Sequence, residues 1–288
     1  MGDSSKIQFF TRSHKGKVKP NNEDYLRVAP ERQVAVIADG IGGKEYGEIA
    51  SETAVESCIK YLCNADLTLL QKRAQREIAN AVKYANETVI TIQRNNEKYR
   101  NMGSTLACCW IDQQQLHYSW VGDSRIYLLQ PSASNITMLS KDHTLDRSKI
   151  DANLAPDLYK RASSILTQTV GGILLLSPET GSAQLNDGDI ILICTDGLSD
   201  RVPDELLLEY SLEFIDNLDA YADKLLDRAL DCGGQDNISF ILAKVSLWSN
   251  FKQQSASTLL KLNKPALKVE LTLQRFACDQ RDLFLSKT

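Results

Sequence analysis

The segment VAVIADGIGG, residues 34–43, places a run of apolar residues directly before an aspartate and a group of glycines. Val34–Ala38 has the composition of a buried strand, and the glycines after Asp39 allow the chain to turn sharply. In WVGDSR (120–125) and ILICTDGLSD (191–200) an apolar run likewise comes before the aspartate, whereas in GGQDNI (233–238) the strand-like run follows it. The pattern predicts carboxylates at four strand ends: Asp39, Asp123, Asp196 and Asp236.

Four such strand ends, brought together, would form a cluster of hard oxygen ligands. Mg²⁺ and Mn²⁺ prefer carboxylate, carbonyl and water oxygens to thiolate or imidazole. The chain has only three histidines, which argues against a zinc-type site. It also has no Cys-x5-Arg segment that would supply a cysteine nucleophile for phosphate chemistry. A magnesium or manganese site is therefore the functional hypothesis that the residues themselves favour.

The order of the periodic segments predicts an α+β fold. Alternation and apolar runs predict strands at 6–12, 24–29, 33–38, 104–111, 115–121, 125–130, 182–185, 189–195 and 237–245. Apolar residues at helical spacing predict helices at 47–63, 67–95, 203–210 and 217–231. We expect the first two strands to pair, and Asn186–Gly188 to form a hairpin turn. Short links between successive strands favour antiparallel sheets, so we predict two mostly antiparallel sheets flanked by helices.

The composition and the net charge limit the classes of binding partner and the cellular compartment that we expect for this chain. The net charge is −4, and residues 246–288 hold seven basic but only three acidic residues, so the rest of the chain is clearly acidic. An acidic body argues against nucleic acid as the main partner. We find no signal peptide and no apolar run long enough for a membrane span. The seven cysteines form no Cys-x-x-Cys pair, and Cys58, Cys108, Cys109 and Cys194 lie in apolar surroundings, which indicates buried thiols in a reducing cytoplasm.

Eight short motifs occur in an order that resembles the metal-dependent 2C-type protein serine/threonine phosphatases (PPM family), and bacterial members in particular. They are NNED (21–24), VAVIADGIGGKEYGEIAS (34–51), MGSTL (102–106), VGDSRIYLL (121–129), LSKDHTL (139–145), LTQTVGG (166–172), DGDIILICTDGLSD (187–200) and GGQDNIS (233–239). The resemblance covers about residues 7–245 and implies a four-layer αββα sandwich with metal ions between its two sheets. We therefore expect a catalytic domain at 1–245 and a basic C-terminal extension at 246–288.

The resemblance also implies roles for individual residues. Asp39 would bridge two metal ions, with the Gly40 carbonyl on the second and Asp196 and Asp236 on the first. Asp123, together with Asp196, would hold a third ion. The catalytic set would be Asp39, Asp196 and Asp236, acting through a metal-bound water.

Further implied roles concern residues around the metal ligands. Glu23 and Asp24 match positions that hold metal-bound waters, and Asn237 would orient the loop beside Asp236. Lys19 stands where the family usually has a phosphate-binding arginine. Lysine can bind phosphate as a point charge but lacks the bidentate fork, so we expect weaker phosphate affinity. Ile41 occupies a position where some members have a histidine general acid, and the sequence does not identify a replacement.

The predicted function is a cytoplasmic hydrolase in signalling: a phosphatase that uses two or three Mn²⁺ or Mg²⁺ ions. Its substrates would be phosphoserine and phosphothreonine in proteins modified by a cognate Ser/Thr kinase. Two alternatives remain open: a weak or silent phosphoprotein-binding module, and a phosphatase of small phosphate esters.

Two segments outside the motifs also have expected roles. Residues 146–164 fall where relatives carry a flap beside the active site. The extension is open to three interpretations: an inert tail, a segment that docks or adds a strand through residues 267–273, or a recruiter of partners.

Some polar residues near the motifs have a structural interpretation that competes with a functional one. His143 is expected to brace the region after the Asp123 loop rather than to bind metal. Two roles are equally compatible with the position of Arg125: it pairs with an acidic residue of the site, or it simply lies at the edge of a strand. Ser104 and Thr105 are expected to pack within the sheet.

Overall fold

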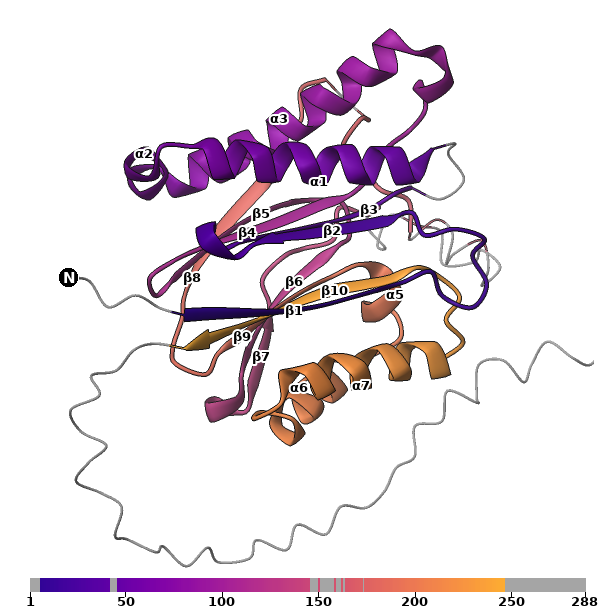
Figure 1. Cartoon of the computed structure of the whole chain (residues 1–288). Helices are drawn as coiled ribbons and strands as arrows, with labels where there is room; N and C mark the ends of the chain where they lie inside the picture. Colours follow the sequence, from indigo (N-terminus) through magenta and orange to yellow (C-terminus); the bar gives the residue numbers. More distant parts are fainter. Residues whose placement is uncertain are drawn as a thin grey trace, which may run out of the picture. The chain divides into compact units, whose positions relative to one another are not determined.

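Ten strands form two five-stranded sheets in the computed structural model, which describes residues 6–41, 46–145, 150, 158, 162, 164–172 and 174–246 (Figure 1). One sheet has the order β1-β10-β9-β6-β7 and contains Lys6–His14, Ile238–Ser246, Ile190–Cys194, Arg125–Gln130 and Asn135–Met138. The other has the order β2-β3-β4-β5-β8 and contains Asp24–Ala29, Val34–Asp39, Leu106–Asp112, Gln115–Val121 and Glu179–Gln184. Every neighbouring pair is antiparallel.

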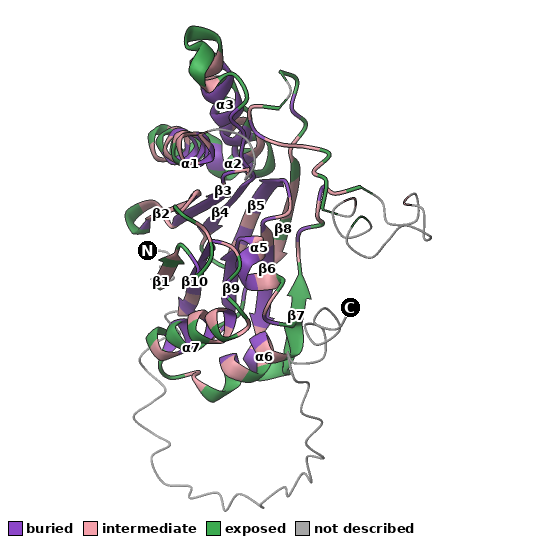
Figure 2. Ribbon diagram, turned by 90° about the vertical axis from the view of Figure 1, so that its right-hand side faces the viewer, coloured by how far each residue is buried: buried purple, intermediate pink, exposed green. Residues whose placement is uncertain are grey.

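Helices cover the outer face of each sheet, so the layers are helix, sheet, sheet and helix (Figure 1). The β2–β8 sheet carries α1 (Gly47–Asn64), α2 (Leu67–Lys72) and α3 (Ala74–Asn95). The other sheet carries α5 (Asp196–Ser199), α6 (Asp204–Glu213) and α7 (Leu218–Asp231). Three apolar cores follow from this arrangement, one between the sheets and one beneath each helical layer, and Figure 2 shows buried residues throughout the central strands. The predicted αββα sandwich is confirmed.

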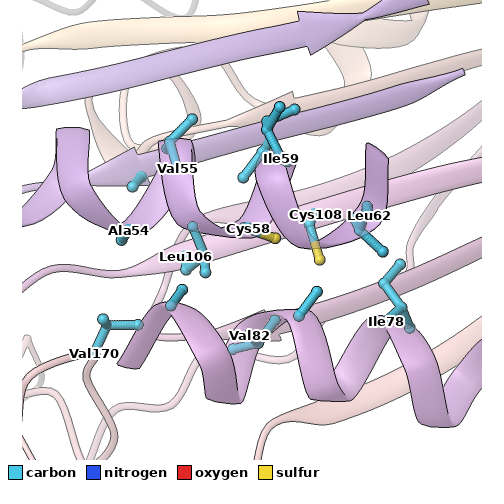
Figure 3. Packing of buried hydrophobic residues seen from close by; sticks show 14 of the residues in the cluster. Ala54, Val55, Cys58, Ile59, Leu62, Ile78, Val82, Leu106, Cys108 and Val170 are labelled. Atoms are coloured by element: carbon cyan, nitrogen blue, oxygen red, sulfur yellow. The ribbon is translucent and has the colours of Figure 1, made fainter. Parts of the chain in front are cut away.

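The core beneath α1 and α3 contains two cysteines whose sulfurs face each other (Figure 3). The hydrogen bond with Cys108 and burial raise the pKa of Cys58 well above its ordinary value, and burial does the same for Cys109. Cys194 is buried in the core of the other sheet. All four are free, buried thiols, as the sequence predicts, and burial in an apolar core makes them poor nucleophiles.

Three expectations about connectivity are wrong. β1 and β2 do not pair, because β1 pairs with β10 while β2 pairs with β3 in the other sheet. β8 and β9 likewise belong to different sheets, so residues 186–188 do not close a hairpin. The helix expected at 67–95 is broken at Arg73, whose backbone (φ −137°, ψ 38°) ends α2 and precedes α3.

Two crossings between the sheets, from β1 to β2 and from β5 to β6, gather strand ends at one edge of the sandwich. β1 ends there before the chain crosses to β2, and β5 ends there before it crosses to β6. The same edge receives the end of β3, the end of β9 and the start of β10, as the paired positions Asp24–Asp39, Arg125–Cys194 and Phe240–Cys194 show.

No described helix has the length and hydropathy needed to cross a lipid bilayer. The proposed division at residue 245 stays a prediction, because residues 247–288 lie outside the part of the chain that the structure describes. Most of the expected flap, 146–164, lies outside it as well.

Candidate active site

The predicted carboxylates occupy the strand ends at this edge. Asp39 is the last residue of β3, and Asp24, the first residue of β2, lies opposite it. Asp196 begins α5 directly after β9, and Asp236 precedes the first residue of β10 by two positions. Asp123 lies in the turn that carries the chain from β5 to β6. Both sheets therefore contribute carboxylates to the same place.

The electrostatics show that these carboxylates act on one another. Burial raises the pKa of Asp39 well above its ordinary value, and the negative charges of Asp24, Asp196, Asp123 and Asp236 raise it further. Asp196 has a raised pKa from burial and then from the charges of Asp123 and Asp236. Burial is also the main reason that the pKa of Asp24 rises to about 7 and that of Asp123 to about 6. Such a cluster is unfavourable on its own and favours a bound cation.

The donor atoms fit a hard divalent cation. Asp24 Oδ1 and Asp196 Oδ1 are buried and accept no hydrogen bond within the described residues. The clustered side chains supply carboxylate oxygens, the ligands that Mg²⁺ and Mn²⁺ prefer. No three histidine, cysteine or acidic side chains of the described ranges converge into a finished coordination sphere.

The backbone of Asp39 is fixed by two hydroxyl side chains at the start of β4. Thr105 Oγ1 accepts a hydrogen bond from the Asp39 N–H (2.9 Å), and Ser104 Oγ donates to the Asp39 carbonyl (2.8 Å). Thr105 Oγ1 also bonds with Ser124 Oγ, beside Asp123 (2.7 Å). The expectation that Ser104 and Thr105 only pack the sheet is therefore incomplete. The sequence did contain a signal for this role: two hydroxyl residues follow Gly103 just before the strand that begins at Leu106.

Gly40 lies where no side chain fits. A Cβ at this position would lie 2.4 Å from the backbone carbon and oxygen of Gly47 and 2.7 Å from the Glu23 carbonyl oxygen. The Gly40 N–H donates to that same Glu23 carbonyl at 3.0 Å. The geometry explains why glycine follows Asp39, whereas the role of its own carbonyl as a metal ligand stays a prediction.

Lys19 reaches the carboxylate cluster through an ion pair. Its Nζ lies 2.7 Å from Asp236 Oδ1. Burial opposes the positive charge, but the hydrogen bond to Asp236 and the charges of Asp236, Asp39 and Glu23 outweigh it, so the pKa of Lys19 is raised. A permanent cation therefore stands at the edge of the cluster, where a phosphate group would approach metal ions.

Asn237 joins the loop that carries Lys19 to the start of β10. Its side-chain oxygen accepts from the Glu23 N–H (2.8 Å), and its side-chain nitrogen donates to the carbonyls of Lys15 and Asn21 (both 2.9 Å). Its backbone N–H donates to Asp236 Oδ1 (2.8 Å). The side chain is buried, and its contacts are those of a residue that orients this loop.

Replacing Asn237 with alanine is expected to lower the free energy of unfolding by about 2 kcal/mol or more, because the Glu23 N–H and two carbonyls lose their partner. Urea unfolding followed by circular dichroism measures this loss. Asn21→Ala is the matched control, since Asn21 is an exposed residue of the same loop and alanine keeps its backbone carbonyl. Equal losses in both variants would contradict the role given to Asn237.

Comparison with known proteins agrees with the geometry. The model of the protein phosphatase 2C family matches residues 12–233. The chain is 28% identical to the serine/threonine phosphatase stp of Listeria innocua over 255 residues, covering 85% of this chain and 98% of that protein. It is 30% identical to the protein phosphatase PhpP of Streptococcus pneumoniae over 244 residues, covering 80% and 94%.

The fold matches solved structures as well. The catalytic domain of the serine/threonine protein phosphatase PstP, a protein of Mycobacterium tuberculosis, has been solved in complex with two manganese ions. It superposes with a TM-score of 0.72 at 27% identity, covering 84% of this chain and all of that one. The chain therefore belongs to the protein phosphatase 2C family of metal-dependent protein phosphatases.

Proposed function

We propose that this protein phosphatase hydrolyses phosphoserine and phosphothreonine with Mn²⁺ or Mg²⁺ held by Asp39, Asp196, Asp236 and the Gly40 carbonyl. Asp123 and Asp196 would hold a third, weaker ion. The observation that supports this most strongly is the mutual raising of carboxylate pKa values at one edge of the sandwich. A divalent cation turns that repulsion into attraction.

The residues of the chain divide the remaining work. When bound, the metal ions would activate a water and polarise the phosphoryl oxygens. The ammonium group of Lys19 would move from Asp236 to the incoming phosphate. Asp236 and the phosphate are both anions, and the flexible lysine side chain can pair with either. Glu23 and Asp24 would accept hydrogen bonds from metal-bound waters. Thr195 Oγ1 donates to Asp24 Oδ2 (2.9 Å) and leaves Oδ1 to accept from such a water.

The physiological setting is proposed from the same observations. The substrates would be proteins phosphorylated by a cognate Ser/Thr kinase in the cytoplasm. Several free thiols within the described residues agree with a reducing compartment.

A metal-dependence assay tests the proposal. The full chain is expected to hydrolyse an aryl phosphate only with Mn²⁺ or Mg²⁺, and Asp236→Asn to be inactive under the same conditions. Full activity in EDTA, or in this variant, would overturn the metal mechanism. A panel of phosphoserine and phosphothreonine peptides then separates a protein phosphatase from one of small esters, because only the former should prefer peptides.

Lys19→Arg is expected to lower the KM for an aryl phosphate about threefold to tenfold, because a guanidinium binds phosphate through two hydrogen bonds. The value of kcat should change little if the side chain only binds the phosphate. Steady-state kinetics at saturating Mn²⁺ measure both, and Lys17→Arg, in an exposed position of the same loop, is the control. An unchanged or higher KM would count against phosphate binding by residue 19.

A further inference from the structure

Residues Leu139–His143, which we call the strap, run along the turn that carries Asp123. Every residue of the strap contacts β5, β6 or the turn between them. The Leu139 N–H donates to the Ile126 carbonyl (2.7 Å), Ser140 Oγ accepts from the Ile126 N–H (2.9 Å), and the Lys141 carbonyl accepts from Trp120 Nε1 (2.9 Å). Asp142 binds Arg125 (2.8 Å), so Arg125, the first residue of β6, pairs with the strap and not with one of the predicted site carboxylates.

His143 ends the strap and holds Gly122 from both sides. Nδ1 of its ring accepts from the Gly122 N–H (3.2 Å), while its own backbone N–H donates to the Gly122 carbonyl (2.9 Å). Nε2 lies 3.1 Å from Oε1 of Glu179, at the start of β8. The ring stacks on Trp120 with 5.8 Å between centroids and 15° between planes.

These contacts define one tautomer. Nδ1 can accept from the Gly122 N–H only as an unprotonated nitrogen, so the proton of the neutral ring lies on Nε2. Nε2–H then donates to the Glu179 carboxylate. The ring is buried between the turn, β5 and β8, and each of its two nitrogens has one partner with a fixed role.

The turn at Gly122 has a backbone geometry that leaves no room for a side chain. Gly122 has φ +100°, and a Cβ there would lie 2.6 Å from the methyl group of Thr105. Its N–H, at the crossing between the two sheets, donates to the His143 ring. Loss of that acceptor would leave a buried donor without a partner and would free the backbone next to Asp123.

We propose that His143 is a positioning residue: through the Gly122 N–H, its Nδ1 fixes the Asp123 carboxylate for the weaker divalent cation. The inference rests on the proposed function, in particular on the role of Asp123. It is distinct from metal ligation by His143, whose two ring nitrogens face Gly122 and Glu179.

Two substitutions separate the two nitrogens of the ring. The amide oxygen of His143→Asn can take the place of Nδ1 and accept from Gly122, whereas the longer His143→Gln can replace only the Nε2 contact with Glu179. Mn²⁺ titration of the full-length protein by calorimetry should show the weaker binding step. We expect His143→Gln to raise the dissociation constant of that step about tenfold, as is typical of residues that orient metal ligands, and His143→Asn to change it less than about threefold. Equal weakening in both variants, or none in His143→Gln, would overturn the inference.

Two further measurements show whether a change in Mn²⁺ binding comes from the His143 contact or from a loss of folding. Thermal unfolding in EDTA should show that both variants are folded at the temperature of the titration, so that the difference in Mn²⁺ binding does not come from unfolded protein. The ring tautomer of the unmodified protein is measured directly by ¹⁵N NMR, which is practical because the chain has only three histidines. A neutral ring with the proton on Nδ1 would overturn the inference even if neither variant folds.

The inference and the proposed function fail in different ways. Wild-type protein with Mn²⁺-dependent turnover, but with identical Mn²⁺ isotherms for His143→Asn and His143→Gln, overturns the inference alone. Wild-type protein with turnover but without a weaker binding step overturns the inference together with the third-ion role of Asp123, and leaves the mechanism with two metal ions standing. Wild-type protein without any metal-dependent turnover overturns the proposed function and the inference with it.

Discussion

Replacing Asp39 with asparagine is expected to lower kcat for Mn²⁺-dependent hydrolysis more than about 100-fold while stabilising the metal-free protein. The loss should exceed the 10–100-fold typical of residues that only support metal ligands. The gain in stability follows from the raised pKa of Asp39, because its charge is opposed by burial and by four neighbouring carboxylates. An amide keeps the shape of the side chain and removes that charge.

Opposite signs for activity and stability make this test specific. Turnover of an aryl phosphate and the melting temperature in EDTA are measured on the same preparations. Asp216→Asn, which neutralises an exposed aspartate, is the control and should change neither quantity appreciably. An Asp39→Asn protein that is both inactive and less stable would show that Asp39 supports the fold in some other way.

The metal-free protein is expected to lose stability as the pH rises from about 4 to about 7. The folded state raises the pKa of Asp123 from 3.8 to about 6 and that of Asp24 from 3.8 to about 7. The folded state therefore holds protons that the unfolded chain releases, and stability falls as the pH rises through this window. For Asp123 alone the difference corresponds to about 3 kcal/mol at pH 7.

Urea unfolding at pH 5 and pH 7.5 in EDTA measures this trend. Other ionisable groups also titrate, so the decisive comparison is with Asp123→Asn, whose stability should depend less steeply on pH. Mn²⁺ should reverse the trend in the wild type, because metal binding requires deprotonated carboxylates and strengthens as the pH rises. The same slope in wild type and Asp123→Asn would contradict a raised pKa at this position.

Much of the fold could be predicted because the relevant signals are local in the sequence. A strand that ends in Asp-Gly is visible in ten residues, and the order of eight short motifs was enough to indicate the family and the αββα layers. The pairing of β1 with β10 could not be predicted in this way, because those strands lie at opposite ends of the described chain. The break at Arg73 is equally hidden, since the apolar spacing continues across it.

The candidate site also combines predictable and unpredictable parts. The carboxylates could be predicted from their motifs, but the hydrogen bonds that hold them and their loops come from residues remote in sequence. Thr195 donates to Asp24 across 171 positions, and Asn237 bonds with the Glu23 N–H across 214. The contact of His143 with Glu179 depends on β8 lying beside β5, which no periodicity in either segment specifies. Such contacts are properties of the assembled sandwich.

The site also takes its dimensions from the sandwich. Asp39 belongs to one sheet, while Asp196 and Asp236 adjoin the other, so the distance between opposing ligands equals the separation and offset of the two sheets. That spacing is set by the core between them, where Ile37, Ile193 and Ile241 meet. Mg²⁺ demands a tighter and more regular shell of oxygens than larger divalent ions. In the proposed mechanism, the choice between metal ions would therefore depend partly on aliphatic side chains of the core, because their packing sets the distance between the carboxylates of the two sheets.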